Sequence, residues 1–192
     1  MGKTYERIDG RLRDFIERQP LFFIATAPLS EDGHVNLSPK GRAGTSALLD
    51  DRTFAYVDFG GSGAETIAHL RENGRVTVMW CAFEGPPNIV RIHGRGEPVF
   101  RDDPRWPELI AKIPEGKKPS ARAIIVVTAD RISDTCGYAV PLMDYQGDRT
   151  LHEEFFGRKT DAEFAAYCES KDYVGTSLDG LPALPLPLPQ AP

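Results

Sequence analysis

The chain has few cysteines, no long apolar run and no excess of positive charge. Its three cysteines are not in C-x-x-C spacing, which favours a reduced cytoplasmic protein without a disulfide framework. The first twenty residues are too charged for a signal peptide, and no apolar stretch is long enough to span a membrane. The formal net charge of −5 argues against nucleic-acid binding, which usually needs a basic footprint. We therefore expect a cytoplasmic protein that contacts neither nucleic acid nor membrane.

Several catalytic motifs are also missing. The sequence has no G-x-S-x-G elbow, no Walker loop and no G-x-G-x-x-G turn between a strand and a helix. None of the four histidines has metal-ligand spacing to a cysteine or to another histidine, so we expect no metal site. A protein nucleophile is therefore not indicated.

Hydrophobic periodicity predicts six strands and a smaller number of helices. Apolar runs and alternation predict strands over residues 21–29, 34–39, 53–59, 75–83, 89–100 and 121–133. Apolar faces and helix-start signals predict helices over residues 5–18, 60–74, 102–113, 150–157 and 160–171. Short turns between the strands favour an antiparallel barrel with helices outside, because barrel closure removes exposed strand edges.

Local signals add detail to these elements. Two pairs have the spacing of a helix capping box: Ser62 with Glu65, and Thr160 with Glu163. Gly94 and Gly96 indicate a bulge or bend in the fifth strand. The proline-rich tail, residues 181–192, should be extended and lie on the surface. Binding of this tail to a partner domain with an aromatic groove is the alternative.

A basic, glycine-containing loop follows the second predicted strand, with the sequence SPKGRAG over residues 38–44. Ser38, Lys40 and Arg42 could bind a phosphate together with backbone N–H groups of the loop glycines. The alternative is an ordinary solvated turn.

A second loop, GGSGAE over residues 60–65, leads into a helix N-terminus, where unpaired N–H groups attract anions. A capping box would satisfy some of these donors, and Glu65 would repel a phosphate. This loop therefore indicates a phosphate site only if it lies beside residues 38–44.

Other candidates have plain structural alternatives. Three basic residues share one face of the fifth predicted strand and line either an anionic pocket or an exposed face: Arg91, His93 and Arg95. Trp80 could stack on a planar ring or belong to the core. Cys136 and Tyr138 form a cluster at a strand end, which is either part of a pocket or a buried thiol beside a packed tyrosine.

Taken in order, these segments resemble the pyridoxamine 5′-phosphate oxidase-like family of flavin-binding split barrels. Three stretches carry the resemblance: FFIATAPLSEDGHVNLSPKG (22–41), TFAYVDFGGSGAETIAHLRENGRVTVMWCAF (53–83) and IVRIHGRGEPVF (89–100). The likeness covers roughly residues 8–135. It implies a mainly β fold, a six-stranded antiparallel Greek-key split β-barrel with peripheral helices. It also implies a homodimer with flavin mononucleotide (FMN) at each side of the subunit interface.

The resemblance further implies which residues contact the cofactor. The contacts to the phosphate fall on Ser38, Pro39, Lys40 and Gly41, and at the helix start on Ser62, Gly63, Glu65 and Thr66. The contacts to the ring and ribityl chain fall near Val57 and Asp58. Trp80 and Arg91 would lie near the ring or the partner subunit, and Cys136 and Tyr138 would border the substrate.

The sequence departs from the classical oxidase at two places. Glu65 and Thr66 stand where that enzyme has an Arg-Lys pair, so Lys40 and Arg42 would have to supply the missing positive charge. Residues 136–192 also lack the R-L-x-P and H-x-R signatures that hold the substrate phosphate in the classical oxidase. We therefore do not expect oxidation of pyridoxamine phosphate.

The expected organisation has three parts. Residues 1–135 form the FMN-binding barrel with its N-terminal helix, residues 136–180 a helical extension packed on the barrel, and residues 181–192 the tail. The expected function is that of an FMN-dependent oxidoreductase acting on an unknown small molecule, in which the flavin carries the redox step. The alternatives are the same barrel binding a deazaflavin or haem, and a non-catalytic flavin-binding protein.

Overall fold

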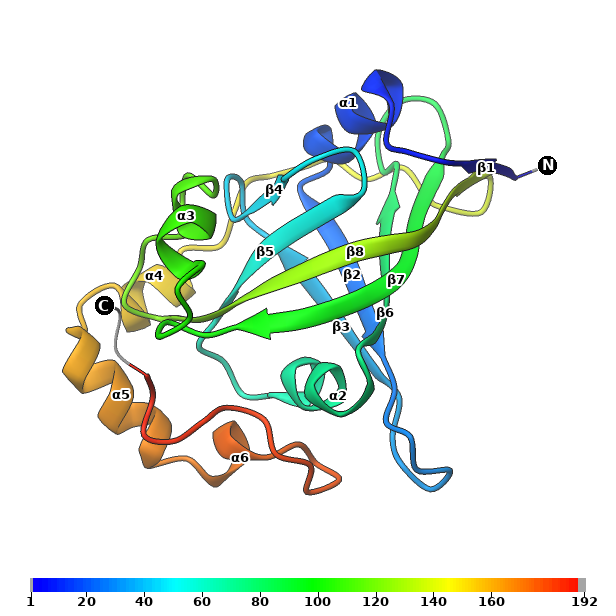
Figure 1. Cartoon of the computed structure of the whole chain (residues 1–192). Coiled ribbons are helices and arrows are strands. Elements are labelled where there is room, and N and C mark those ends of the chain that lie inside the picture. Colours follow the sequence, from blue (N-terminus) through cyan, green and yellow to red (C-terminus); the bar gives the residue numbers. More distant parts are fainter. Residues whose placement is uncertain (1, 190–192) are drawn as a thin grey trace.

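A single antiparallel sheet forms the centre of the computed structural model, which describes residues 2–189 (Figure 1). Its strands are β1 (Lys3–Tyr5), β2 (Leu21–Thr26), β3 (Asn36–Gly41), β4 (Ser46–Leu48), β5 (Thr53–Phe59), β6 (Arg75–Cys81), β7 (Ile89–Val99) and β8 (Ala121–Thr135). The order is β3-β2-β6-β7-β8-β5-β4, and β1 pairs with β8. The sheet curls into a half-barrel, which confirms the predicted split-barrel class. All six predicted strands are present, and the short β1 and β4 are additional.

Helices surround this sheet. They are α1 (Gly10–Arg18), α2 (Glu65–Asn73), α3 (Trp106–Ala111), α4 (Leu151–Phe156), α5 (Asp161–Glu169) and α6 (Asp172–Gly175). The first five correspond to predicted helices, whereas α6 was not expected. Helix α2 packs against β2, β6 and β7, and α3 packs against β8. No helix within residues 2–189 combines the length and the apolar character needed to cross a membrane.

The N-terminal helix begins later than residue 5, where the apolar spacing placed its start. Tyr5 belongs to β1, and its hydroxyl donates to a carboxylate oxygen of Asp134 at 2.6 Å. The helix starts only after Asp9, whose side chain accepts a hydrogen bond from the backbone N–H of Leu12. Pairing with β8 therefore draws the first residues out of the helical pattern.

The alternation in β5 separates two apolar cores. Phe54 and Tyr56 point into the larger core, where they contact Phe22. Ala55 and Val57 point the other way, into a smaller core beneath α3. The next side chain on the face of Phe54 and Tyr56 is that of Asp58, so β5 carries a buried carboxylate toward the main interior.

The bulge predicted in the fifth strand is present. The register between β7 and β8 shifts between His93 and Gly94. A Cβ atom at Gly94 would lie 2.0 Å from the carbonyl oxygen of Thr128, so no larger residue fits this close approach.

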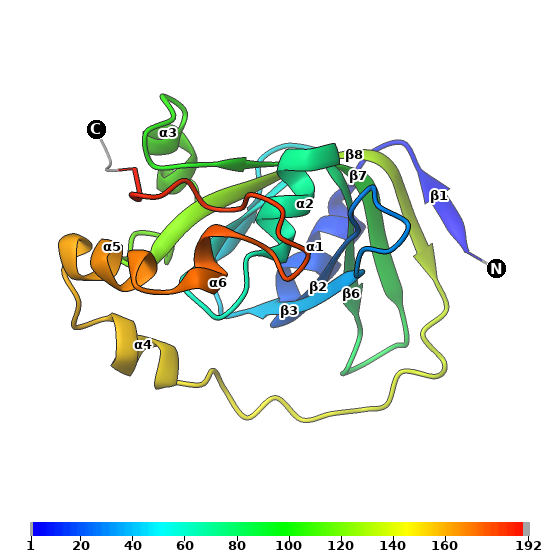
Figure 2. The same ribbon diagram turned by 90° about the horizontal axis from the view of Figure 1, so that it is seen from below.

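The C-terminal third wraps around one side of the barrel. Figure 2 shows the irregular segment after β8 running along the molecule before it reaches α4. Helix α5 has the predicted capping box at Thr160, and Phe164 and Cys168 are buried in the main core. In the tail, Ala183 and Leu184 are also buried there. The extended tail thus packs on the chain itself, and its residues 190–192 lie outside the described residues.

Candidate functional site

A large cleft of about 1810 Å³ opens between β3, the start of α2 and the segment 143–152. Eleven of the predicted cofactor residues line it: Ser38, Pro39, Lys40, Gly41, Arg42, Val57, Asp58, Ser62, Gly63, Glu65 and Thr66. The two glycine-containing loops, far apart in sequence, therefore face the same space. This meets the condition under which the second loop indicates an anion site.

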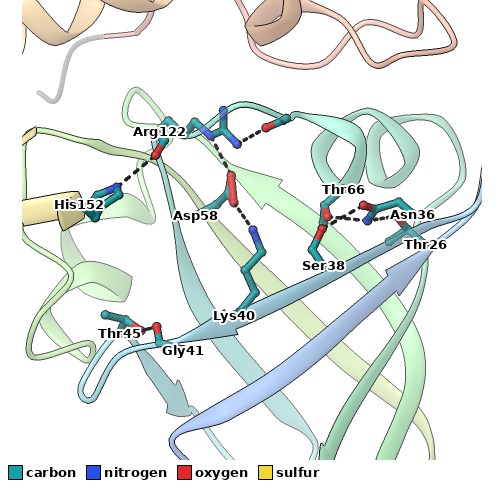
Figure 3. A network of polar contacts seen from close by, with 12 residues as sticks. Thr26, Asn36, Ser38, Lys40, Gly41, Thr45, Asp58, Thr66, Arg122 and His152 are labelled. Carbon is teal, nitrogen blue, oxygen red and sulfur yellow. Dashed lines mark hydrogen bonds and ion pairs between the residues drawn. The ribbon is translucent and has the colours of Figure 1, made fainter. Parts of the chain in front are cut away.

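A buried carboxylate joins two cations beside this cleft (Figure 3). Asp58 is only 2% exposed, and its two oxygens accept from Lys40 Nζ at 3.0 Å and from Arg122 Nε at 2.9 Å. Burial by itself raises the pKa of Asp58, but the charges and hydrogen bonds of Arg122 and Lys40 outweigh it, so that its pKa is lowered. Two cations and one anion leave a net positive charge, which suits an anionic ligand.

Arg122 also connects β8 to the glycine-rich loop, because its guanidinium donates to the carbonyl oxygen of Gly63. Its Nη1 atom is buried without a hydrogen-bond partner among the described residues. Sequence analysis missed this residue, although a signal existed. Arg122 interrupts the apolar run ARAIIVV, and a charge inside a buried strand must find a partner there.

A network of hydroxyl and amide groups lies next to the ion pairs (Figure 3). The Asn36 side-chain amide donates to Thr26 Oγ1 at 3.1 Å and to Thr66 Oγ1 at 3.0 Å, and Ser38 Oγ donates to Asn36 Oδ1 at 2.9 Å. His69 Nδ1 lies 2.9 Å from Thr26 Oγ1. Because Thr66 Oγ1 only accepts within this network, its own proton is available to a ligand in the cleft.

The predicted capping box at Ser62 is wrong. Helix α2 begins at Glu65, its N-cap is Ala64, and no side chain caps it. The carbonyl oxygen of Gly63, just before the N-cap, accepts a hydrogen bond from Arg122. The first N–H groups of α2 are therefore not satisfied by a cap, which strengthens this end as an anion site.

Arg42 lies at the other end of β3 with a positive φ of 84°. It forms an ion pair with Glu153, and its Nη1 is 3.3 Å from His152 Nδ1. His152 Nε2 lies 3.1 Å from the carbonyl oxygen of Gly60, so this α4 residue connects both loops. Burial is the main cause that lowers the pKa of His152. Lys40 and Arg42, expected to replace the missing Arg-Lys pair, thus each have a carboxylate partner already.

Four predicted residues are not brought to the cleft. Trp80 is 1% exposed and packs between Phe22 and Phe54 in the core. Three others lie outside the lining of the cleft: Arg91, Cys136 and Tyr138. Arg91 projects from the outer face of β7, and Cys136 and Tyr138 are exposed at the start of the irregular segment. The face of β7 and the path of the chain after β8 keep these residues out of the cleft. Residue spacing in the sequence does not reveal either feature.

Residues 8–136 match a family model described as pyridoxamine 5′-phosphate oxidase. The chain belongs to this family. A relative from Aspergillus flavus, named pyridoxamine 5′-phosphate oxidase family protein ustO, is 39% identical over 94% of this chain and 77% of that protein. This alignment extends beyond residue 136, so the likeness includes part of the C-terminal segment that the family model leaves out.

One solved structure shares the fold of this chain, and a second has a weaker likeness. A crystal structure of an H111A variant of HupZ from Group A Streptococcus has a TM-score of 0.55 and 22% identity, over 67% of this chain and 99% of that one. HutZ from Vibrio cholerae, described as a haem storage protein, has a TM-score of 0.48 and 13% identity, over 69% of this chain and 98% of that one. These likenesses concern the barrel and not its ligand.

Within residues 2–189, no cluster of three or more His, Cys, Asp or Glu side chains is suited to hold a metal ion. His152 is the histidine that lines the cleft, and both of its ring nitrogens already face polar atoms, Arg42 Nη1 and the Gly60 oxygen. The donor set of the cleft thus fits a phosphate-bearing organic ligand better than a metal-centred one.

Proposed function

We propose that this member of the pyridoxamine 5′-phosphate oxidase family binds FMN in the cleft and acts as an oxidoreductase on a small molecule. One observation carries the proposal: residues 38–42 line the same cleft as the loop 60–65, which indicates an anion site only when the two lie side by side. Its volume of about 1810 Å³ leaves room for a substrate beside a flavin, since pockets for a single ligand are commonly 300–1,000 Å³.

The residues present fit a phosphate at the start of α2. The uncapped N–H groups, the free hydroxyl proton of Thr66 and the ammonium of Lys40 are all donors. The backbone N–H of Gly63 adds a further donor, and the Ser38 hydroxyl, which donates to Asn36 Oδ1 here, would join the set by turning toward the phosphate. A bound flavin would supply electron exchange with the substrate, while the protein supplies binding and orientation.

Other residues hold the donors of this phosphate site in position. Asp58 orients Lys40, and Arg122 holds the carbonyl of Gly63, so its loop can present N–H groups to the cleft. His152 contacts both loops from the C-terminal segment. Such fixed donors need little rearrangement when an anion binds, which raises affinity.

Membership of the family does not identify the substrate. Glu65 and Thr66 replace the Arg-Lys pair of the classical oxidase, and the C-terminal signatures for a substrate phosphate are absent. We therefore propose a substrate other than pyridoxamine phosphate. Residues 143–149, which line the open side of the cleft, would border it.

We also propose a homodimer in the cytoplasm. Large apolar side chains are exposed along the segment that follows β8, namely Tyr138, Leu142, Met143, Tyr145, Leu151 and Phe155. A second copy that covers them would remove this apolar surface from water. The three free cysteines suit a reducing compartment. A monomer in size-exclusion chromatography at micromolar concentration would contradict the dimer.

An absorption spectrum followed by FMN titration tests the flavin proposal. We expect flavin bands in the purified protein, or saturable binding that weakens at least tenfold in Lys40→Ala. Lys112→Ala removes an equal charge from the surface and should change the affinity less than twofold. Absence of bands and of binding would refute the proposal, and titration with a deazaflavin and with haem would then identify the ligand. Bound FMN that no nicotinamide nucleotide reduces, and no acceptor oxidises, would indicate a non-catalytic flavin-binding protein.

A further inference from the structure

A group of basic side chains lies on the outer face of the sheet, away from the cleft. They come from three adjacent strands: Arg75 on β6, Arg91, His93 and Arg95 on β7, and Arg131 on β8. In the register Arg75 is directly opposite Arg95, and His93 is opposite Arg131. Like charges opposite one another destabilise a sheet. Such an arrangement in a chain of net charge −5 needs an explanation beyond solubility.

Three of these side chains border one groove. Arg75, His93 and Arg95 line a depression of about 450 Å³, and it shares no lining residue with the large cleft. Apolar and hydroxyl groups complete its walls, among them Val35 and Thr77. A volume of this size lies within the common range for small-molecule sites, about 300–1,000 Å³.

Neutral groups orient the two arginines without neutralising them. Arg75 donates to Asn73 Oδ1 at 3.2 Å and to the carbonyl of Pro28 at 3.0 Å, and Arg95 donates to the carbonyl of Asn73 at 2.7 Å. That carbonyl ends α2, and a helix C-terminus carries only about half a negative charge. Asp130 is the one carboxylate among the described residues that line the groove. The groove therefore keeps a positive balance.

Several other arginines of the chain differ from these two in having a carboxylate partner. Arg11, Arg42 and Arg105 each pair with a carboxylate, whereas within residues 2–189 no carboxylate pairs with Arg75 or Arg95. Burial lowers the pKa of His93, and the charges of Arg131 and Arg91, which lie on the same sheet face outside the groove lining, lower it further.

We propose that this groove is a second anion-binding site, which takes a small organic phosphate. The forked guanidinium groups of Arg75 and Arg95 match phosphate oxygens, and the apolar wall can contact the organic part. A nucleic acid would need a longer basic surface than one groove on an acidic protein. The site does not depend on the flavin proposal, because it uses none of the residues of the cleft.

Calorimetric titration with phenyl phosphate at low ionic strength tests this site. We expect saturable binding to the purified protein that weakens at least tenfold in the double variant Arg75→Ala, Arg95→Ala, the loss expected for charge-assisted hydrogen bonds. Lys112→Ala, Lys117→Ala removes the same charge from exposed positions near α3 and should change the affinity less than twofold. Thr77→Glu, which places a negative charge in the groove, should weaken binding as strongly without removing any arginine.

Three results would overturn the proposal. The first is no binding by the unaltered protein at millimolar phenyl phosphate. The second is full affinity in the arginine double variant, because the phosphate would then be held in the large cleft. The third is an equal loss in the lysine control, which would mean only general attraction. Inorganic phosphate should bind more weakly than phenyl phosphate, and equal affinity would refute the role of the apolar wall.

Discussion

Replacement of Asp58 by asparagine tests the buried charge network most directly. The substitution keeps the shape of the side chain but removes the carboxylate that pairs with Lys40 at 3.0 Å and Arg122 at 2.9 Å. Arg122 is 4% exposed, so its charge would stay buried without a counter-ion. Loss of one partner from a buried pair costs about 3–5 kcal/mol. For a protein of this size, each kcal/mol lowers the melting temperature by roughly 2–4 °C, so we expect a decrease of roughly 6–20 °C.

Two further variants give reference values for the free-energy cost of Asp58→Asn, with all three measured by urea and thermal unfolding. Lys40→Met leaves Asp58 paired with Arg122, so it should cost less, about 1–2 kcal/mol. Asp103→Asn breaks a surface pair with Arg105 and should cost under about 1 kcal/mol. The expected order of destabilisation is therefore Asp58→Asn, then Lys40→Met, then Asp103→Asn.

The pH dependence adds an independent check. Burial raises the pKa of Asp58, yet Arg122 and Lys40 together lower it below its ordinary value. The stabilisation is then fully present above the unfolded pKa, about 3.9, and is lost as the pH falls through the lower folded pKa. The stability difference between wild type and Asp58→Asn should be constant from pH 5 to pH 8. A loss below about 1 kcal/mol at pH 7, or a cost no greater than that of Lys40→Met, would refute the reasoning.

Four other substitutions are expected to have distinct effects. Gly94→Ala should destabilise the fold by about 3 kcal/mol because its methyl group meets the Thr128 carbonyl. Gly10→Ala, with open space around it, should instead stabilise α1 by about 0.5–1 kcal/mol. Urea unfolding measures both, and a Gly94→Ala protein as stable as Gly10→Ala would show that the contact with Thr128 is unimportant. Glu65→Gln should tighten FMN binding by roughly twofold to fivefold, since it removes a like charge near the phosphate, and weaker binding in a fluorescence titration would place the phosphate elsewhere. Burial is the main cause that lowers the pKa of His152. The stability that depends on its neutral form is therefore present above about pH 6.5 and lost as the pH falls through its lower folded pKa. His152→Gln should flatten this loss, and an unchanged pH profile of the melting temperature would show that His152 does not cause it.

Elements with strong local patterns were predictable. The alternation in β5 separates Phe54 and Tyr56 from Ala55 and Val57, and any sheet must send neighbouring side chains to opposite faces. The capping box at Thr160 forms because its donors and acceptors lie within four residues. At Ser62 the same pattern fails, because the helix begins only after Ala64 and the Glu65 carboxylate accepts from the distant Leu178 N–H, a contact that no local pattern reveals.

The sequence by itself determined where six strands lie along the chain, which two loops have the composition of an anion site, and the resemblance to the family. These depend on short-range periodicity and on residue types that remain readable along the chain. Only the tertiary structure decided how the charges are paired. Lys40 and Asp58 are 18 positions apart, and Arg122 is 64 positions from Asp58, so no local rule connects them. The curl of the sheet brings these three side chains into one buried cluster beside the cleft, because a charge removed from water must find its partner wherever the fold places one.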